Sequence, residues 1–183
     1  MSNAPGNLDW QPVLDRLNLV ASPVAKALAE WEFAGEVLVA AIDASLADTA
    51  TFCERYQVTA EESANCVVVA GKRAGETSYA AGLLLATTRL DVNGAVRNRL
   101  GARKASFAPL EDAVERTGME YGGITPIGLP GWPVLVDSRV SESAGMVVIG
   151  SGIRGSKIAL PAARVHALPA AEVITDLATV IAQ

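Results

Sequence analysis

The segment best suited to chemistry is residues 118–133, GMEYGGITPIGLPGWP, which holds five glycines and three prolines. Adjacent glycines reach backbone angles closed to other residues, so Gly122 and Gly123 can turn successive N–H groups toward one point. Pro126 and Pro130 then stiffen the chain that follows. Such a nest of amides binds an anion, or the oxyanion that develops during acyl transfer. The alternative is a surface loop in which glycine only permits turning and proline only gives rigidity.

Histidine and cysteine are too few to suggest the common side-chain mechanisms. His166 is the only histidine, and its surroundings read as a surface helix, so no Ser/His/Asp set is predicted. Cys53 and Cys66 lie thirteen residues apart with no histidine near either, which does not match the ligand spacing of a zinc site. We therefore expect two free thiols, no metal and no cofactor, with a thiol nucleophile as the open alternative.

A second glycine-rich segment, GSGIRG at residues 150–155, fits the G-x-G-x-x-G pattern of dinucleotide-binding turns. The context does not fit, because the following residues 156–160 are short, β-like and closed by Pro161, where a helix should open. Only 28 residues follow Gly155, too few for the rest of such a unit. The segment is predicted to be a tight turn between two strands that lines a site.

Composition limits the fold and the partners. The 183 residues are half apolar, which is enough for one well-buried core and short for two. No apolar run approaches the roughly 20 residues that span a bilayer, and the N-terminus lacks the features of a signal peptide, so we expect a cytoplasmic protein without a membrane partner. A net charge of −5 argues against a broad basic face, so DNA is not expected and any RNA should be bound at a small local site.

The pattern of elements predicts an α+β fold. Residues 1–35 read as a helical region, with helices over 8–20 and from Ser22, and residues 36–183 as the main domain. Strands joined partly by hairpins and partly through helices favour a mixed sheet. The expected strands are residues 36–42, 66–70, 79–87, 103–107, 134–136, 146–149 and 157–160, and the expected later helices are 48–56, 91–100, 109–118, 161–167 and 176–182.

The order of these motifs resembles the YbaK/prolyl-tRNA editing domain family. The resemblance rests on ARKASFAPLEDAVERTGMEYGGITPIGLP, then PVLVD, then VVIGSGIRGSKIAL, and extends over about residues 50–170. The G-x-x-x-P element of that family falls on residues 122–126. The resemblance implies a single domain with a strongly curved, barrel-like mixed sheet flanked by helices. It also implies an aminoacyl-tRNA deacylase that acts in trans, on a small amino acid such as alanine or cysteine attached to tRNA specific for proline.

The same resemblance implies the residues of the site. Gly122, Gly123, Ile124 and Thr125 would surround the scissile ester carbonyl, and a free hydroxyl of the substrate ribose would assist. The substrate-binding residues would be Asn65, Pro126, Gly150, Ser151 and Gly152.

The chain departs from the family at two positions. Asn65 stands where most members carry a lysine that contacts the terminal nucleotide, and Lys157 stands where bacterial members that act on cysteinyl-tRNA carry an aspartate. We hypothesise that Lys157 faces Asn65 across the pocket and has taken over the phosphate or carbonyl contact. The alternative is a solvated Lys157 in a protein that has lost catalysis.

Two classes of function therefore stay open. The first is the trans-editing hydrolase, with the tRNA acceptor 3′ end and prolyl-tRNA synthetase as expected partners. The second is a non-catalytic relative that binds a tRNA 3′ end, a nucleotide or another aminoacyl-like ligand. A protein this acidic that engages tRNA would need its cations near the pocket, and its tRNA binding would be salt-sensitive. The candidates are Lys72, Arg73, Arg97, Arg99, Arg103, Lys104, Arg154 and Lys157.

Overall fold

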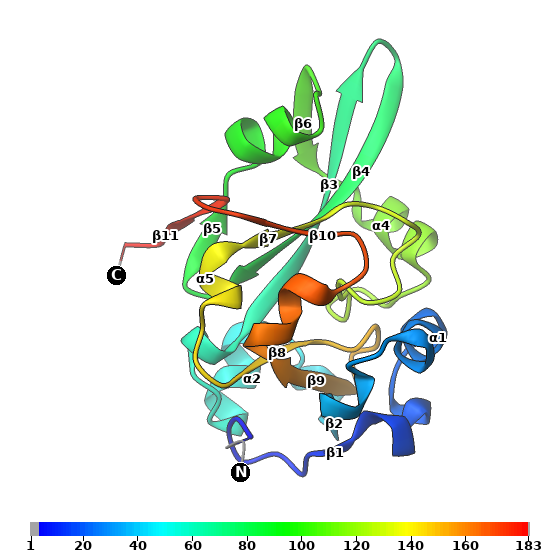
Figure 1. Cartoon of the computed structure of the whole chain (residues 1–183), viewed down its shortest axis with the longest axis vertical. Coiled ribbons are helices and arrows are strands. Elements are labelled where there is room, and N and C mark those ends of the chain that lie inside the picture. Colours follow the sequence, from blue (N-terminus) through cyan, green and yellow to red (C-terminus); the bar gives the residue numbers. More distant parts are fainter. Residues whose placement is uncertain (1–3, 183) are drawn as a thin grey trace.

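The chain forms three β-sheets with short helices around them, as Figure 1 shows. The computed structural model describes residues 4–182. A long hairpin of the central sheet projects from one end of the molecule, and a four-stranded sheet lies toward the other end (Figure 1). The arrangement is that of an α+β protein with mixed strand directions, as expected from the sequence.

The four-stranded sheet is antiparallel throughout and carries the second glycine-rich turn. Residues 151–155 join two of its strands, and Gly150 pairs with Lys157 in register. The predicted tight turn is therefore confirmed, and the absence of a helix directly after it removes the dinucleotide-binding interpretation. In spatial order the strands are β1 (Gln11–Pro12), β2 (Leu38–Ala41), β9 (Ser156–Pro161) and β8 (Met146–Gly150).

The five-stranded sheet is mixed and is built around the predicted hairpin of β3 and β4. Its order is β10 (Ala171–Ile174), β7 (Val134–Asp137), β4 (Glu76–Leu85), β3 (Ala64–Arg73) and β6 (Lys104–Phe107). The first three strands run parallel, and β3 is antiparallel to both of its neighbours. A small third sheet pairs β5 (Thr88–Leu90) with β11 (Ala178–Val180).

The prediction of a barrel-like, strongly curved sheet is wrong. The strands separate into three open sheets, none of which is closed or strongly curled within the described chain. The two larger sheets meet where β3 begins, through a single parallel bridge between Ser63 and Val148. Because β6 and β10 remain edges of the five-stranded sheet, no strand closes it.

The helices are short and lie beside the sheets. They are α1 (Ser22–Glu30), α2 (Thr49–Tyr56), α3 (Arg97–Arg99), α4 (Leu110–Thr117) and α5 (Ser138–Ser141). As predicted, α1 starts at Ser22 and Gly118 ends α4 in the left-handed conformation, with φ of 67°. None of the helices in the described residues is long and apolar enough to cross a membrane.

Two helices expected near the ends of the chain are absent from the described residues. Residues 8–20 instead form β1 and two 3₁₀ turns, because the amide of Val13 donates to the carbonyl of Val37 and its side chain is fully buried. Residues 178–180 form β11, because they pair with β5. In both segments long-range pairing overrides local helix preference.

The main core lies between the four-stranded sheet, α1 and the near face of the five-stranded sheet. Val24 and Leu28, four residues apart on α1, are fully buried in it, as one face of an amphipathic helix should be. Val13 also belongs to this core, so the described residues before 36 pack into the same body as the rest. A second cluster, around Leu90 and Leu177, covers the other face of the five-stranded sheet.

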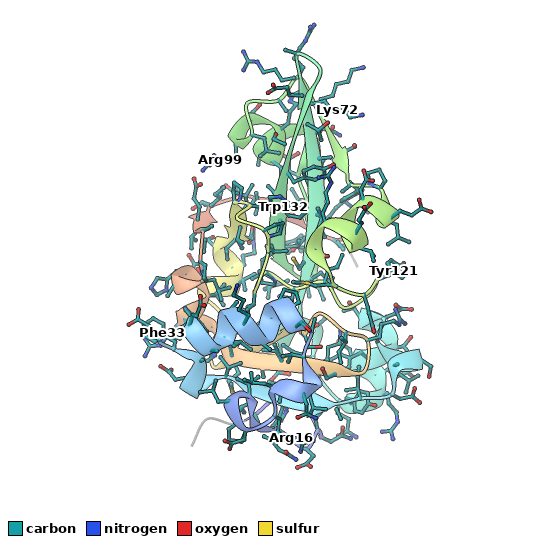
Figure 2. The ribbon with its side chains drawn as sticks, turned by 90° about the vertical axis from the view of Figure 1, so that its right-hand side faces the viewer. Arg16, Phe33, Lys72, Arg99, Tyr121 and Trp132 are labelled. Carbon is teal, nitrogen blue, oxygen red and sulfur yellow. The ribbon has the colours of Figure 1, made fainter. Side chains whose placement is uncertain are left out.

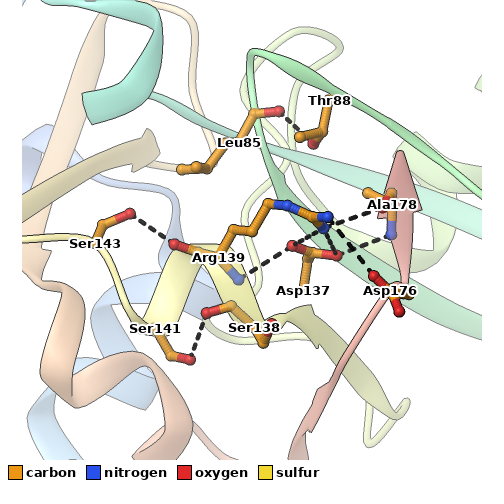
Figure 3. A network of polar contacts seen from close by, with 9 residues as sticks. All are labelled: Leu85, Thr88, Asp137, Ser138, Arg139, Ser141, Ser143, Asp176 and Ala178. Atoms are coloured by element: carbon orange, nitrogen blue, oxygen red, sulfur yellow. Dashed lines mark hydrogen bonds and ion pairs between the residues drawn. The ribbon is translucent and has the colours of Figure 1, made fainter. Parts of the chain in front are cut away.

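Asp137, the aspartate that ends β7, is a buried anchor for the C-terminal strand. Its Oδ2 accepts a hydrogen bond of 2.8 Å from the amide of Ala178, and its Oδ1 accepts one of 3.1 Å from the amide of Arg139. The Arg139 guanidinium lies 3.2 Å from Oδ1 and also reaches the carboxylate of Asp176, as Figure 3 shows. The carboxylate therefore holds α5 and β11 together, away from the cavity described below.

We expect Asp137→Ala to lower the free energy of unfolding by about 3 kcal/mol, because it leaves a partly buried guanidinium and a buried amide without their acceptor. Chemical denaturation measures the loss. Asp176→Asn is the matched control, since its carboxylate is 82% exposed and should cost less than about 1 kcal/mol. Equal losses in the two variants would contradict the anchoring role.

Candidate functional site

A cavity of about 460 Å³ opens between the first glycine-rich loop, the edge of β3 and the start of α2. It is the place where segments far apart in the sequence meet. Its walls are formed by Ala47, Asp48, Thr49, Ala64, Asn65, Cys66, Val67, Val68, Phe107, Ala108, Leu110, Ala113, Tyr121, Gly122, Ile124, Gly150 and Lys157. A volume of this size fits a small organic ligand.

One wall of the cavity is an unpaired stretch of the β3 edge. Strand β6 pairs with β3 only from Val69 to Lys72, so the edge before Val69 has no neighbouring strand. The carbonyls of Val68 and Lys72 accept hydrogen bonds from the β6 side, so the even-numbered residues direct their backbone groups that way. By the same alternation Cys66 directs its N–H and C=O into the cavity.

The two glycine-rich segments pack directly on each other and form the opposite wall. The amide of Gly152 donates to the carbonyl of Gly123 at 2.7 Å, and the amide of Glu120 donates to the carbonyl of Gly152 at 2.9 Å. A Cβ on Gly150 would lie 2.6 Å from the carbonyl oxygen of Gly123 and 2.8 Å from that of Ile124. Glycine is therefore required at residue 150 for the two backbones to approach this closely.

The amides of the first loop are only partly available to a ligand. The N–H of Gly123 donates to the carbonyl of Glu120 at 3.0 Å, which removes it from the predicted nest. Within residues 4–182 no acceptor pairs with the N–H groups of Gly122 or Ile124, and both residues line the cavity. Gly122 adopts a φ of 77°, which only glycine reaches without strain.

Half of the residues expected at the site do not line the cavity. Thr125 is fully buried, and its Oγ1 has no hydrogen-bond partner in the described chain. Ser151 is also fully buried, and its hydroxyl lies 3.1 Å from the carbonyl oxygens of Ile153 in its own turn and of Ser156 at the start of β9, which are its acceptors. The structure thus places Asn65, Gly122, Ile124, Gly150 and Lys157 around the cavity. Gly123, Thr125, Ser151 and Gly152 lie behind its wall, and Pro126 lines a second cavity beside Trp31 and Trp132.

Lys157 is a buried cation in the floor of the cavity. Its side chain rises from β9, its Nζ donates a hydrogen bond of 3.1 Å to the carbonyl of Ala47, and it lies 5.0 Å from the ring centroid of Phe52. The residue is 9% exposed, which excludes the alternative of a solvated strand lysine. Burial lowers the pKa of Lys157 from its ordinary value of 10.5, because desolvation disfavours the ammonium form.

Asn65 lines the same cavity as Lys157. Its Oδ1 accepts a hydrogen bond of 2.7 Å from the hydroxyl of Thr49, which fixes the amide plane and leaves the NH₂ group as a donor. The side chain that replaces the usual lysine is therefore polar, oriented and neutral. The hypothesis that Lys157 and Asn65 share one pocket agrees with this placement.

Hydrogen bonds from Arg154 connect the segments at the rim of the cavity. Its Nη1 donates to the carbonyl of Tyr121 at 3.3 Å and lies 3.5 Å from Oδ1 of Asp48, and its Nε donates to the carbonyl of Ala44 at 3.2 Å. Arg154 thus connects the first glycine-rich loop, its own turn and the segment before α2. The sequence alone indicated Arg154 only as one of several candidate cations for tRNA.

Burial disfavours the thiolate form of both cysteines. Burial raises the pKa of the Cys66 thiol to about 12, so it stays protonated at neutral pH. Burial also raises the pKa of Cys53, which lies outside the cavity wall. Both thiols are free. The described residues contain no group of three or more histidine, cysteine, aspartate or glutamate side chains that could hold a metal ion.

The architecture defines a class of protein: a single α+β domain whose ligand cavity is enclosed by two glycine-rich segments and the edge of a sheet. The chain belongs to the aminoacyl-tRNA editing domain family, whose sequence model matches residues 43–167, more than half of its length. This membership supports a role in aminoacyl-tRNA editing. None of the curated proteins compared with the chain matches it.

Solved structures share the fold at low sequence identity. One is a candidate trans-editing enzyme for prolyl-tRNA synthetase, with 21% identity and a TM-score of 0.70, which covers 90% of this chain and 96% of that one. Another comes from a study of epitope backbone grafting onto scaffold proteins, with 21% identity and a TM-score of 0.71, which covers 85% of this chain and 95% of that one.

Proposed function

We propose that this protein is a trans-editing aminoacyl-tRNA deacylase. Its substrate would be a tRNA specific for proline that carries a wrongly attached small amino acid such as alanine or cysteine, and it would act in the cytoplasm alongside prolyl-tRNA synthetase. The observation that carries the proposal is that one cavity is lined both by free backbone amides and by a buried cation. Family membership supports the same reaction.

The cavity suits the hydrolysis of an ester by water. Water attacks the carbonyl carbon, the carbonyl oxygen becomes an oxyanion, and the ester bond breaks as the ribose oxygen leaves with the proton that water has lost. The amides of Gly122, Ile124 and Cys66 are the available backbone donors for that oxyanion. The ammonium of Lys157 adds a positive charge where little water screens it.

Selection among amino acids would follow from size. The cavity must hold the aminoacyl group and part of the terminal nucleoside within about 460 Å³, which favours small side chains. Each extra methylene shifts binding by only about 1 to 3 kcal/mol, so neighbouring amino acids are separated modestly. The apolar wall of Val68, Leu110 and Ala113 is the part most suited to the side chain.

A deacylation panel tests the proposal. Purified protein is incubated with alanyl, cysteinyl, seryl and prolyl esters of tRNA specific for proline and of a second tRNA, and released amino acid is measured. We expect fastest release from the alanyl or cysteinyl ester of the proline tRNA and slowest from its prolyl ester. Binding without hydrolysis of any ester would instead support the non-catalytic alternative, which the neutral Asn65 favours.

The rate should depend on the protonation of Lys157. Burial lowers its pKa below 10.5, and the charged form predominates only below the lowered pKa. If the ammonium stabilises the oxyanion, the enzymatic rate falls as the pH rises through the lowered pKa. The pH profile of single-turnover deacylation, corrected for spontaneous ester hydrolysis, should show this descending limb. Lys157→Met should lack the limb, and a limb that persists in the variant would assign it to another group.

A further inference from the structure

A cluster of cations surrounds the free end of the β3–β4 hairpin, outside the cavity. We call it the hairpin patch, and its members are Lys72, Arg73, Arg97, Arg103 and Lys104. Two shallow hollows of about 390 and 590 Å³ lie between these side chains. The whole chain carries a net charge of −5, so this end of the molecule is opposite in sign to the rest.

The hairpin patch is built by close packing of a distant segment on β3. A Cβ on Gly71 would lie 2.9 Å from Cβ of Ala102, so glycine is what allows this contact. The amide of Arg103 donates to the carbonyl of Lys72 at 2.9 Å, and the guanidinium of Arg73 donates to the carbonyl of Gly101 at 3.0 Å. The cations are therefore held on one framework of paired backbone.

The charges of the hairpin patch are not compensated within the described chain. Lys72 of β3 lies directly opposite Lys104 of β6, an arrangement that destabilises a sheet. None of the five ion pairs of the described residues includes a member of the patch. Glu76 lies opposite Arg73 in the hairpin register, but no ion pair joins their side chains in the described chain. A polyanion would relieve this repulsion.

The strand that leads to the hairpin patch starts in the cavity. Asn65 lines the cavity, and Lys72 follows seven residues later on the same strand, a distance of about 23 Å at roughly 3.3 Å per residue. Figure 2 shows Lys72 on the projecting part of the hairpin, above Tyr121 at the cavity. A stacked strand rises about 3.4 Å along its axis for each nucleotide, so this distance corresponds to about seven stacked nucleotides. That is longer than the unpaired 3′ end of a tRNA and reaches its duplex.

We infer that the hairpin patch binds the phosphate backbone of the acceptor stem of the tRNA whose aminoacyl end occupies the cavity. The inference rests on the proposed function for its choice of nucleic acid. Contacts to phosphates fix the position of a duplex without reading its sequence. The patch would thus position the 3′ end along β3 so that it enters the cavity. Discrimination among amino acids would take place in the cavity.

The test measures binding of uncharged tRNA by the full chain at several salt concentrations, so it does not depend on catalysis. The variant is Lys72→Gln with Lys104→Gln. The control is Lys26→Gln with Arg89→Gln, which removes the same charge from exposed residues of α1 and β5. We expect the patch variant to bind about tenfold more weakly at low salt, with the slope of log K against log salt reduced by about 2. The control should bind like the original protein.

A second measurement separates this inference from a general loss of structure. Because the two lysines repel each other, the patch variant should be at least as stable as the original protein in thermal unfolding. Weaker binding to a hairpin RNA that copies the acceptor stem, with unchanged binding to the single-stranded trinucleotide CCA, supports the assignment to the duplex. Equal binding by patch and control variants, or equal loss for the trinucleotide, overturns it even if deacylation is observed. Reduced stem binding upholds it even if no ester is hydrolysed.

Discussion

Lys157→Met is expected to lower kcat/KM for deacylation by about 10² to 10³-fold, the usual effect of removing one donor from an oxyanion site. Methionine keeps an unbranched apolar stem, one heavy atom shorter than the lysine side chain, and removes the ammonium from a position that is 9% exposed. Because the ammonium acts on charge that develops in the transition state, kcat should fall and KM should change little. Steady-state kinetics with the best substrate of the panel measure both parameters.

The stability of the same variant shows whether the loss is catalytic. Burial disfavours the charged lysine, so Lys157→Met should be no less stable than the original protein. Lys26→Met, which removes an exposed cation from α1, is the control and should keep full activity. Unchanged deacylation by Lys157→Met would show that the buried ammonium has not replaced the missing lysine.

Gly150→Ala should abolish deacylation to below about 1% of the original kcat/KM and lower stability by about 1 to 3 kcal/mol. The added Cβ would meet the carbonyl oxygens of Gly123 and Ile124 at 2.6 and 2.8 Å. Both are backbone atoms, so the loop itself must move away from β8. That movement displaces the amides of Gly122 and Ile124 from their places in the cavity wall.

Gly155→Ala is the matched control for Gly150→Ala. It lies at the other end of the same turn, and its added Cβ would meet no atom closer than 4.0 Å, the Cδ1 of Ile153. Activity and thermal midpoint should both stay near the original values. If Gly150→Ala retained activity as well, the contact between the two glycine-rich segments would not be needed for the site.

The parts of the fold that local patterns determine could be predicted from the sequence. The β3–β4 hairpin and the turn between β8 and β9 follow from apolar runs flanked by glycine and polar residues. The end of α4 at Gly118 follows from the left-handed conformation that glycine adopts there. The grouping of Asn65 with Lys157 came from the resemblance to the family, since the two residues are far apart in the chain.

Other features depend on contacts that no local pattern reveals. Strand β6 pairs with β3 only from Val69 to Lys72. The earlier part of the β3 edge is therefore free, and Cys66 lines the cavity there. The pair of glycines predicted that the amide of Gly123 could bind a ligand. In the structure this amide instead donates to the carbonyl of Glu120 and closes a turn. The burial of Lys157 depends on the carbonyl of Ala47, 110 residues earlier. The division into open sheets depends on long-range pairing in the same way.

The most direct test of the central claim is to locate the aminoacyl end in solution. Adenosine carrying alanine through a stable 3′-amide bond is titrated into ¹⁵N-labelled protein, and the amide resonances are followed. We expect saturable shifts at the cavity amides of Cys66, Gly122 and Ile124. Shifts confined to the second cavity, of about 330 Å³ between Trp31 and Trp132, or no shift at the three amides at saturation, would contradict it.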